Sequence, residues 1–563
     1  MRYIILFGAF LLSIQSLSSQ SSTLTKIVVA YQEIQDQQKD IYKSSWPDFT
    51  SENSSQTLLA YKGLLKNILA IDHTDLNTQE LINAELLELI LRDKIDNRSY
   101  RSELMPLSAE GGFIISMIYN LQGKLLDDKE SITQYKALLD DTPRYVNQQI
   151  ALMRTGLAEN KVMPKLVATN CLTLLKKIQS DGFAFMKLPL SSAEISDTEK
   201  VDFAQYIDGP IGDSFQRLED FLSLEYIPQT RADVGVGLNQ DGKSYYEQRV
   251  KYFTTLVMTP DEVFKLGKSE VARIKGEMKK IISDLNFDGS FSDFLEYLRT
   301  EKSFYAETPQ DLLNHAAWLS MKAQEILPRY FTKLPSLPFT VKPVPDDIAP
   351  TYTTGRYSGG SFTGMRAGAY LVNTYNLPAR PKYVLPSLTL HEAVPGHHLQ
   401  ISLAKELDLP KFRKNQYLSA FGEGWGLYAE YLGKEAGMYT TPYEDFGRLT
   451  YEMWRACRLV VDPGMHYFGW TREEAVQYMA DNTSLSLHEV NTEIDRYIGW
   501  PGQAVSYKIG ELKIRELREK AETELGSDFD LRAFHDLVLS NGSIPLSSLE
   551  RIVIDYIETQ KKK

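Results

Sequence analysis

The chain has 563 residues, of which 43% are hydrophobic and 24% are charged, and its formal net charge at pH 7 is -12. These proportions are typical of globular proteins and exclude disordered and fibrous classes, and the length allows roughly two to four domains. The acidic balance argues against a nucleic-acid partner, because nucleic-acid binding requires a basic face that neutralises phosphates.

The first residues have the pattern of an export signal. Arg2 precedes an apolar stretch over residues 3–14, and small residues follow at Ser16 and Ser18. We therefore predict a signal peptide over residues 1–18 and a periplasmic or extracellular location. The apolar stretch is shorter than the ~20 residues of a membrane span, so no stable membrane insertion is expected after cleavage. No cysteine lies directly after this stretch, so a lipid anchor on cysteine is not expected.

Most of the remaining chain has the apolar spacing of helices. In Thr78–Ile95 and Pro143–Thr155, apolar residues recur three or four positions apart. The clearest helix start is Thr259-Pro260-Asp261-Glu262, with threonine at the cap, proline at the first helical position and glutamate three residues after the cap. A helix is expected from there to about Leu285, and the predicted fold class is mainly α.

Two other features bear on the organisation of the chain. A proline-rich stretch over residues 334–350 is the predicted boundary between an N-terminal helical region, residues 19–345, and a C-terminal catalytic region, residues 346–563. The two regions could also form one continuous body. The only cysteines, Cys171 and Cys457, lie far apart in apolar helical contexts, so two buried free thiols are expected rather than a disulfide.

One short segment is predicted to be a strand. Residues Ala367–Val372 follow a glycine-rich loop and precede a cluster of prolines and a new helix. A strand beside that helix could offer its backbone N–H and C=O groups to an extended peptide. An ordinary structural strand is the alternative.

The helix after this strand carries the motif LHEAVPGHHLQ, residues 390–400. Zinc hydrolases need imidazole ligands, a carboxylate that takes a proton from water, and an open coordination position. The familiar arrangement is H-E-x-x-H on one helix, but here Pro395 stands where the second histidine would be. His391 is the first predicted ligand, and Glu392 is the predicted general base.

The second histidine ligand depends on how the backbone passes the proline. In a regular helix His397 would lie roughly 120° from the face of His391, and His398 would lie about 10.5 Å further along the axis. Pro395-Gly396 disrupts a regular helix, and a bulge or wide turn could bring one of them back. We favour His397, because it needs less rewinding, and keep His398 as the alternative.

A third ligand is expected from the segment FGEGWGLYAEYLG, residues 421–433. Glu423 is the predicted zinc ligand. Glu430 lies seven residues later on nearly the same helical face, where it could orient a histidine as an outer partner. Together with the histidine cluster, these residues predict a site for one zinc ion. A solvated carboxylate at a helix start is the alternative for Glu423.

These two segments, with GMRAGAYLVNTYNLPARPKYVLPSLTL before the histidine motif, resemble the bacterial family called domain of unknown function 885. That family is grouped with the gluzincin-type metallopeptidases, which have two histidine ligands and one glutamate ligand. The resemblance covers nearly the whole mature chain and implies a large helical zincin-like body with a substrate cleft and a short β segment beside the zinc-binding helix. Glu423-Gly424-Trp425 is also similar to the zinc-binding segment of aminopeptidases related to leukotriene hydrolase.

Further candidates lie in the segment WRACRLVVDPGMH. Arg455 and Arg458 are three residues apart and could bind a peptide carboxylate in a forked geometry. His466, held by Asp462, could stabilise the oxyanion. A buried ion-pair network that links helices is the alternative.

Zinc peptidases also need a donor to the tetrahedral intermediate, commonly a tyrosine hydroxyl. Tyr497 and Tyr507 are the candidates, and Arg496-Tyr497 is similar to a late Arg-Tyr pair of the angiotensin-converting enzyme family. With 32 tyrosines in the chain, packing is the alternative for each of them.

The predicted function is an exported zinc metallopeptidase-like hydrolase that cleaves short peptides. Zinc would activate a water, and Glu392 would take its proton and pass it to the leaving amine. One alternative is a zinc amidase or esterase acting on a non-peptide envelope component. Another is a binding protein that keeps the fold without the chemistry. The peptide bond chosen and the oligomeric state stay open.

Overall fold

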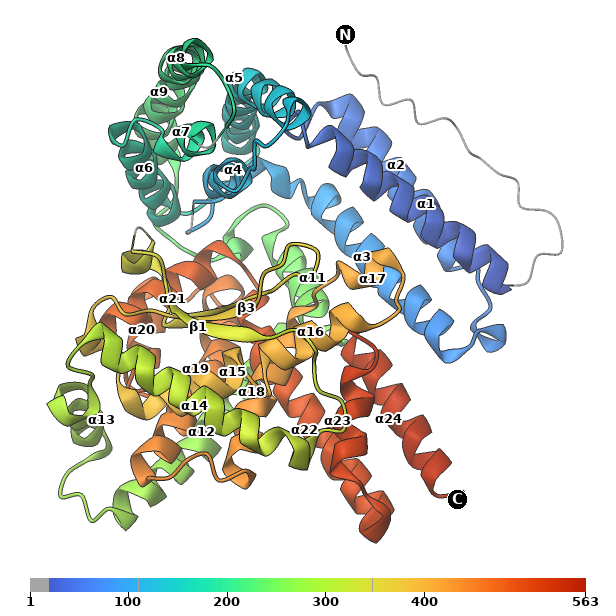
Figure 1. The fold of residues 1–563 in the computed structure, drawn as a ribbon, viewed down its shortest axis with the longest axis vertical. Helices are drawn as coiled ribbons and strands as arrows, with labels where there is room; N and C mark the ends of the chain where they lie inside the picture. The colour runs from blue at the N-terminus through green and yellow to red at the C-terminus, as the bar shows by residue number, and fades with distance from the viewer. Residues whose placement is uncertain (1–19, 110, 192, 347, 563) are drawn as a thin grey trace. The chain divides into compact units, whose positions relative to one another are not determined.

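The protein is described by a computed structural model that covers residues 20–562 except 110, 192 and 347. The predicted signal peptide, residues 1–18, lies outside the described residues. Helices make up most of the chain and a small sheet is the main exception (Figure 1). The prediction of a mainly α fold is therefore confirmed. Within the described residues, the helices are all too short or too polar to cross a membrane.

The chain divides into two compact units. The first contains the residues up to Gln248 together with Ile498–Trp500, and the second contains Arg249–Tyr497 and the residues from Pro501 onward. This division differs from the predicted boundary after residue 345. The proline-rich stretch lies inside the second unit because it includes a strand, β1 (Phe339–Pro343), that pairs with a later strand of the same unit.

The first unit consists of helices. Its helices are α1 (Gln20–Ile41), α2 (Ser51–Ile68), α3 (Thr78–Tyr100), α4 (Phe113–Gln122), α5 (Lys129–Ala158), α6 (Lys165–Ser180), α7 (Ala184–Ser191), α8 (Asp197–Tyr206), α9 (Gly212–Phe221), α10 (Ile227–Gln229) and the start of α11 (Gly242–Thr254). The predicted helix over Thr78–Ile95 is the first part of α3, and the one over Pro143–Thr155 lies within α5.

The second unit contains the remaining helices. They are α12 (Pro260–Asp284), α13 (Phe291–Thr300), α14 (Pro309–Tyr330), α15 (Leu385–Glu392), α16 (His397–Glu406), α17 (Lys411–Lys414), α18 (Ser419–Glu435), α19 (Pro442–His466), α20 (Arg472–Ala480), α21 (Leu487–Gly499), α22 (Ser506–Leu525), α23 (Leu531–Leu539) and α24 (Leu546–Gln560). Helix α12 begins as predicted, because the Thr259 hydroxyl accepts from the Glu262 N–H at 3.2 Å and Glu262 accepts from the Thr259 N–H at 2.8 Å.

Helix α19 is the central element of the second unit. Every residue from Phe446 to His466 is buried, which is the pattern of a helix enclosed on all sides. Helix α12 packs along α19, and α18 packs along α22. The last pair approaches closely at Gly424 and Gly510, where a Cβ added to Gly424 would lie 2.5 Å from the Gly510 Cα.

The sheet has three strands in the order β1–β3–β2, where β2 is Gly355–Ser358 and β3 is Gly368–Val372. Strand β1 runs parallel to β3, and β2 runs antiparallel to it with Tyr357 opposite Tyr370. The predicted strand over residues 367–372 is confirmed as β3. However, β3 is the central strand, so β1 and β2 already occupy its two hydrogen-bonding edges. The expectation that β3 receives a peptide is therefore wrong. The outer edges of the sheet are formed by β1 and β2.

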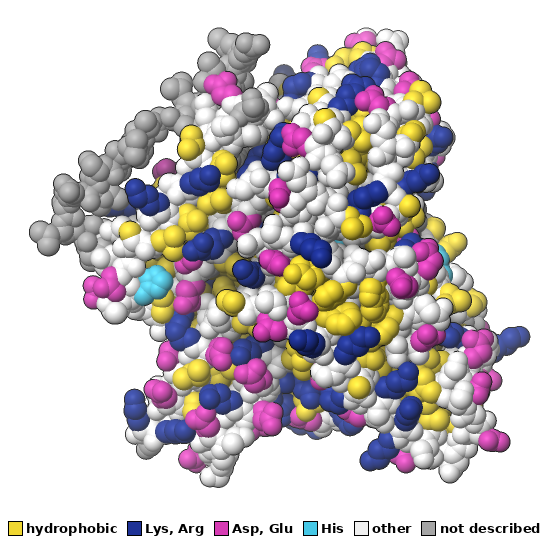
Figure 2. Space-filling model, turned by 180° about the vertical axis from the view of Figure 1, so that it is seen from behind, with side chains coloured by type: hydrophobic (Ala, Val, Ile, Leu, Met, Phe, Trp, Pro, Cys, Tyr) yellow, Lys and Arg dark blue, Asp and Glu magenta, His cyan; other side chains and the backbone are white. Residues whose placement is uncertain are grey.

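The surface and the cysteines agree with the composition. On the face drawn in Figure 2, acidic and basic side chains are interspersed and neither sign forms an extended area. Cys171 and Cys457 are both free and buried, as predicted, and they belong to different units.

A buried histidine ties together three helices of the second unit. His535 on α23 is fully buried, and its Nε2 accepts a hydrogen bond from the Tyr428 hydroxyl at 2.8 Å. Its Nδ1 then donates to the carbonyl oxygen of Tyr330 at 2.9 Å. Burial disfavours the imidazolium and lowers the pKa of His535 to about 4. The ring is therefore neutral in the folded protein at neutral pH.

His535 should make the folded state sensitive to mild acid. An unfolded histidine titrates near pH 6.5, so between pH 6.5 and pH 4 the unfolded chain binds a proton that the folded chain excludes, and stability falls as the pH falls. From pH 7.5 to pH 5 the expected loss is roughly 2 kcal/mol from this residue. Urea unfolding at both pH values should show a smaller loss for His535→Gln than for the wild type. An equal loss in both would contradict this assignment, and the exposed His73→Gln is the control.

Candidate metal centre

The histidine motif is divided between two helices. Helix α15 ends at Glu392 and α16 begins at His397. Between them the Gly396 N–H donates to the Leu390 carbonyl at 2.9 Å, and the Trp425 indole N–H donates to the Pro395 carbonyl at 2.8 Å. The predicted interruption at Pro395-Gly396 is thus a complete break of the helix, with a cis Val394–Pro395 bond.

The break places His397 beside His391. The two imidazole rings have centroids 4.7 Å apart and are nearly perpendicular, at 88°. Glycine is required at position 396 for this path, because a Cβ there would lie 2.0 Å from the carbonyl oxygen of His391 and 2.4 Å from that of Leu390. A side chain at position 396 would therefore push the start of α16 away from the end of α15.

Three donor side chains converge at this point. His391 Nε2 and His397 Nε2 each lie 3.3 Å from the same oxygen, Oε2 of Glu423. One donor atom from each of the three residues lies within 4.8 Å of the others. The structure therefore brings together the three predicted ligands, from α15, α16 and α18. Below, these three residues are called the His–His–Glu cluster.

His398 lies outside the cluster. Its Nδ1 is 3.0 Å from the Tyr357 hydroxyl and 3.3 Å from the Ser402 hydroxyl, and its ring packs on Phe339 with centroids 4.5 Å apart. Burial lowers the pKa of His398 to about 4, against a smaller opposing effect from a backbone hydrogen bond. His398 therefore joins α16 to strands β1 and β2, whereas His397 faces His391 and Glu423.

Glu430 orients His391 from the opposite side of the ring. Its Oε1 lies 2.8 Å from His391 Nδ1, so Nδ1–H donates to the carboxylate and Nε2 is left for the cluster. An outer carboxylate fixes a metal-binding histidine in this way, and the role predicted for Glu430 is compatible with this contact. The ring also needs Gly426 on α18, because a Cβ there would lie 2.7–2.9 Å from three atoms of the imidazole.

The charges of the cluster favour a cation between its members. Burial by itself would lower the pKa of His391, but the hydrogen bonds that its ring donates to Glu423 and Glu430 outweigh this effect and raise the pKa to about 9. Burial likewise opposes ionisation of Glu423, yet the neighbouring histidines hold the pKa of that carboxyl well below its usual range. The two carboxylates thus attract positive charge to the position between the imidazoles.

The spacing of the donors fits a zinc ion. Imidazole nitrogen and carboxylate oxygen are ordinary zinc ligands, with bonds of about 2.0–2.1 Å, and tetrahedral geometry then separates two ligand atoms by about 3.3 Å. Both histidine nitrogens lie at 3.3 Å from Glu423 Oε2. Three protein ligands would leave one position open. The Glu423 side chain is 14% exposed, so the cluster is in reach of solvent.

Glu392 lies next to the cluster, at the last position of α15. Its Oε2 accepts a hydrogen bond from the backbone N–H of Tyr357 at 2.7 Å, and the residue is 8% exposed. Because β2 pairs with β3 on its other side, this bond comes from the outer edge of β2. The predicted general base is therefore held between the end of the histidine helix and the edge of the sheet.

A tyrosine that sequence reasoning missed contacts the cluster. The Tyr417 hydroxyl donates to Glu423 Oε1 at 3.0 Å, and the residue is 40% exposed. It lies in the loop between α17 and α18, six residues before Glu423, and its ring centroid is 6.5 Å from that of His397. Nothing in the local pattern distinguishes this tyrosine from the others. Tyr507, a predicted candidate, is half-buried with the Arg458 guanidinium 4.2 Å from its ring.

Two predicted oxyanion donors are in a buried network instead. The Tyr497 hydroxyl accepts hydrogen bonds from Arg458 Nε at 2.6 Å and Trp454 Nε1 at 2.9 Å, and the residue is fully buried. His466 Nε2 donates to the carbonyl oxygen of Tyr497 at 3.0 Å, and His466 is 1% exposed. Tyr497 on α21 and His466 at the end of α19 are therefore both enclosed by protein and engaged with protein partners, away from solvent.

The two arginines belong to the same network. Arg458 Nη2 lies 3.2 Å from Glu493, and Arg455 Nη2 lies 3.6 Å from Glu430 Oε1. Both arginines are buried. This arrangement matches the alternative interpretation, an ion-pair network linking helices, and not a forked site for a peptide carboxylate. Arg455 contacts the carboxylate that holds His391 and so supports the cluster indirectly.

Comparisons with known proteins give a family and a fold. The family model described as "Bacterial protein of unknown function (DUF885)" matches residues 33–553. A candidate lipoprotein from Colwellia psychrerythraea has a solved structure that is 26% identical, with a TM-score of 0.87, and the match covers 96% of this chain and 100% of that one. A candidate lipoprotein of unknown function from Shewanella oneidensis, 18% identical, has the same fold with a TM-score of 0.77, and the match covers 95% of this chain and 100% of that one. No curated protein matches the chain.

Proposed function

Because the chain belongs to the DUF885 family of bacterial proteins of unknown function, its chemistry has to be inferred from its own residues, and we propose that it is a zinc-dependent hydrolase of the peptidase class. One zinc ion would be held by His391, His397 and Glu423. The observation that carries the proposal is the spacing of these three donors, with both histidine nitrogens 3.3 Å from one carboxylate oxygen. The gluzincin-type ligand set and the zincin-like nature of the body are part of the same proposal.

The chemistry divides between the ion and the protein. Zinc would supply Lewis acidity, which lowers the pKa of water and polarises a carbonyl group. Glu392 accepts a proton from the attacking water and returns it to the leaving amine, as a general base and then a general acid. The Tyr357 N–H holds one oxygen of this carboxylate. Glu430 keeps Nε2 of His391 directed toward Glu423.

A peptide is the substrate that the edge of β2 favours. Among the described residues, β2 pairs with β3 on one side only, and Glu392 binds to its other edge. An extended peptide that adds to this edge gains main-chain hydrogen bonds and passes the general base. This edge replaces β3 as the proposed peptide-binding strand.

Tyr417 is the proposed donor to the developing oxyanion. Its hydroxyl is already at the cluster, 3.0 Å from Glu423 Oε1, and the side chain is partly exposed. A hydroxyl at that place can turn from the carboxylate to a negatively charged oxygen as charge develops there. Tyr507 stays a second candidate because it is half-buried rather than enclosed.

We also propose that the protein is exported. The first 18 residues have the pattern of a signal peptide. Two proteins of the same fold are described as candidate lipoproteins, a class that is exported. A periplasmic or extracellular hydrolase of short peptides is consistent with both observations.

Metal removal tests the proposed function. The purified mature protein should contain about one zinc per chain by elemental analysis, and it should hydrolyse members of a mixture of short peptides. A chelator should abolish hydrolysis and added zinc should restore it, because the metal supplies the Lewis acid. A protein that takes up no zinc after reconstitution, or whose hydrolysis is unchanged by the chelator, would contradict the proposal.

A further inference from the structure

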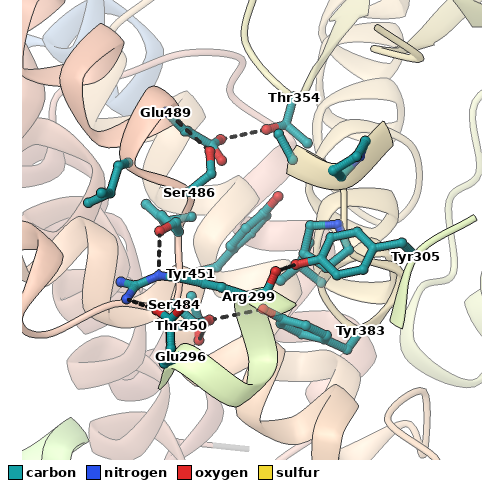
Figure 3. Close-up of a pocket in the computed structure, with 16 residues that line it drawn as sticks. Glu296, Arg299, Tyr305, Thr354, Tyr383, Thr450, Tyr451, Ser484, Ser486 and Glu489 are labelled. Atoms are coloured by element: carbon teal, nitrogen blue, oxygen red, sulfur yellow. Dashed lines mark hydrogen bonds and ion pairs between the residues drawn. The ribbon is translucent and has the colours of Figure 1, made fainter. Parts of the chain in front are cut away.

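A cavity of about 290 Å³ lies in the second unit, apart from the His–His–Glu cluster. Its walls come from five segments of the chain, around residues 296–305, 354, 378–384, 450–451 and 484–489. Figure 3 shows Glu489 and Thr354 facing each other on one side and Tyr383 and Arg299 on the other. The walls combine hydroxyl groups with apolar surface from prolines and leucines. The mechanism proposed above does not use this cavity.

Glu489 gives the cavity its charge. The residue is 8% exposed, and its carboxylate accepts a hydrogen bond from the Thr354 hydroxyl. In the part of the chain that the structure describes, no lysine or arginine forms an ion pair with it. The nearest arginine in the network, Arg380, donates to the Thr354 hydroxyl at 3.1 Å instead. Buried carboxylates are ordinarily paired, and burial raises the pKa of Glu489, so a cation that entered the cavity would find a partner there.

The other charged groups of the cavity are already engaged. The Arg299 guanidinium donates to the carbonyl oxygens of three residues at 2.7–3.1 Å and lies 3.7 Å from Glu296. Glu296 is at the mouth, with a side chain 65% exposed. Arg299 therefore holds the wall formed by residues 480–485. Glu489 is the carboxylate inside the cavity without an ion-pair partner among the described residues, and Arg380 and Arg455 attract its charge only from a longer distance.

The distance from the cavity to Glu392, the proposed general base, can be estimated along two segments of the chain. Thr354 lines the cavity, and Tyr357, whose N–H holds Glu392, is three residues further along the same extended chain, or about 10 Å. Val384 also lines the cavity and immediately precedes α15, and Glu392 at the end of that helix is eight residues further on, or about 12 Å. Both estimates correspond to about three residues of an extended peptide.

We propose that this cavity is a specificity subsite that binds a cationic group of a peptide, a lysine or arginine side chain or a terminal ammonium, about three residues from the bond that is cut. The inference rests on the proposed function and adds the substrate class to it. The apolar surface covers the stem of such a side chain, and the hydroxyls and Glu489 receive its N–H groups. Hydrogen bonds between a cation and a carboxylate are about twice as strong as neutral ones, so Glu489 would dominate the preference.

A lysine scan tests the subsite. A blocked heptapeptide with one lysine placed at each position in turn is compared with the same series containing norleucine, which keeps the stem and lacks the ammonium. At one position, about three residues from the cut bond, lysine should raise kcat/KM by about tenfold or more. A second series with a free N-terminus distinguishes a terminal ammonium from a side chain.

Matched variants attribute the effect to Glu489. Glu489→Gln keeps a hydrogen-bonding side chain and removes the charge, so it should bring the kcat/KM values of the lysine and norleucine peptides close to parity while the zinc content stays near one per chain. Glu296→Gln is the control, and it should keep most of the preference because an exposed carboxylate is screened. A lysine preference that is absent, or that persists in Glu489→Gln, would overturn the subsite.

The subsite and the proposed function fail in different ways. Calorimetry on the Glu392→Gln variant measures the affinity of the peptides for the protein in the absence of hydrolysis. Lysine peptides that bind the variant no more tightly than norleucine peptides would overturn the subsite even if zinc and hydrolysis are present. Tighter binding of lysine peptides that is lost in Glu392→Gln/Glu489→Gln would support the subsite even if no hydrolysis were found.

Discussion

Replacing Glu392 by glutamine is expected to lower kcat by about 10²–10⁴, the range typical of a lost general base, while zinc stays near one per chain. Glutamine has nearly the same shape and can still accept the hydrogen bond from the Tyr357 N–H. It cannot take a proton from water. Peptide hydrolysis and elemental analysis of the same preparations give both quantities.

The matched control for this variant is Glu435→Gln. Glu435 lies at the end of α18, where its carboxylate pairs with Arg518 at 2.9 Å and is partly exposed, so hydrolysis should stay near the wild-type rate. Full activity of Glu392→Gln would remove Glu392 from the mechanism. Loss of zinc together with activity would instead make Glu392 part of the metal site.

The second large effect concerns the two adjacent histidines. Alanine at His391 or His397 should weaken zinc binding at least about 100-fold, beyond the 10–100-fold that outer partners typically contribute, because each removes a proposed ligand. Alanine at His398 should leave zinc bound. Elemental analysis after extensive dialysis, with zinc titration of the metal-free proteins, measures the difference.

His398→Ala should instead lower the stability of the folded protein. The residue is 2% exposed and its imidazole packs on Phe339 and contacts the Tyr357 hydroxyl. Its removal leaves a cavity and a buried hydroxyl without that partner, which lowers the midpoint of thermal unfolding. Loss of zinc from His398→Ala with zinc retained in His397→Ala would reverse the ligand assignment.

The parts of the fold that depend on residues close together in the sequence were predictable. The start of α12 follows from a threonine, a proline and a glutamate at fixed spacing, and the capping hydrogen bonds are present. The strand predicted over residues 367–372 is confirmed as β3. Its position inside the sheet was not predictable, because that depends on pairing with β1 and β2, whose own patterns are weak.

The convergence of the cluster was only partly predictable. The residue types and the disrupting Pro395-Gly396 pair indicated that one of two histidines returns to His391. The choice between them depends on the path of four residues, and a hydrogen bond from Trp425, thirty residues later, helps to fix that path. A pattern along the chain contains no information about such a distant contact.

Residue type alone was misleading for the later candidates. Tyr497 and His466 have the chemistry of oxyanion donors, but Tyr497 on α21 and His466 at the end of α19 are both buried. Tyr417 and Glu489 have no such local signal. They matter because the fold exposes Tyr417 at the cluster and places Glu489 in a cavity with no ion-pair partner among the described residues. Exposure and pairing are properties of the packed structure.

The close approach of α18 to the His391 ring means that the proposed site can be recognised in a related sequence by a glycine as well as by its three ligand residues. Gly426 leaves no room for even one methyl group against that imidazole, so the position of the His391 ring, a proposed zinc ligand, depends on a residue that offers no ligand atom. A relative that keeps the counterparts of His391, His397 and Glu423 but has alanine at this position has a displaced helix and a displaced ring. Such a chain is expected to bind zinc more weakly than this one, and a comparison of the three proposed ligand positions alone would not reveal the difference.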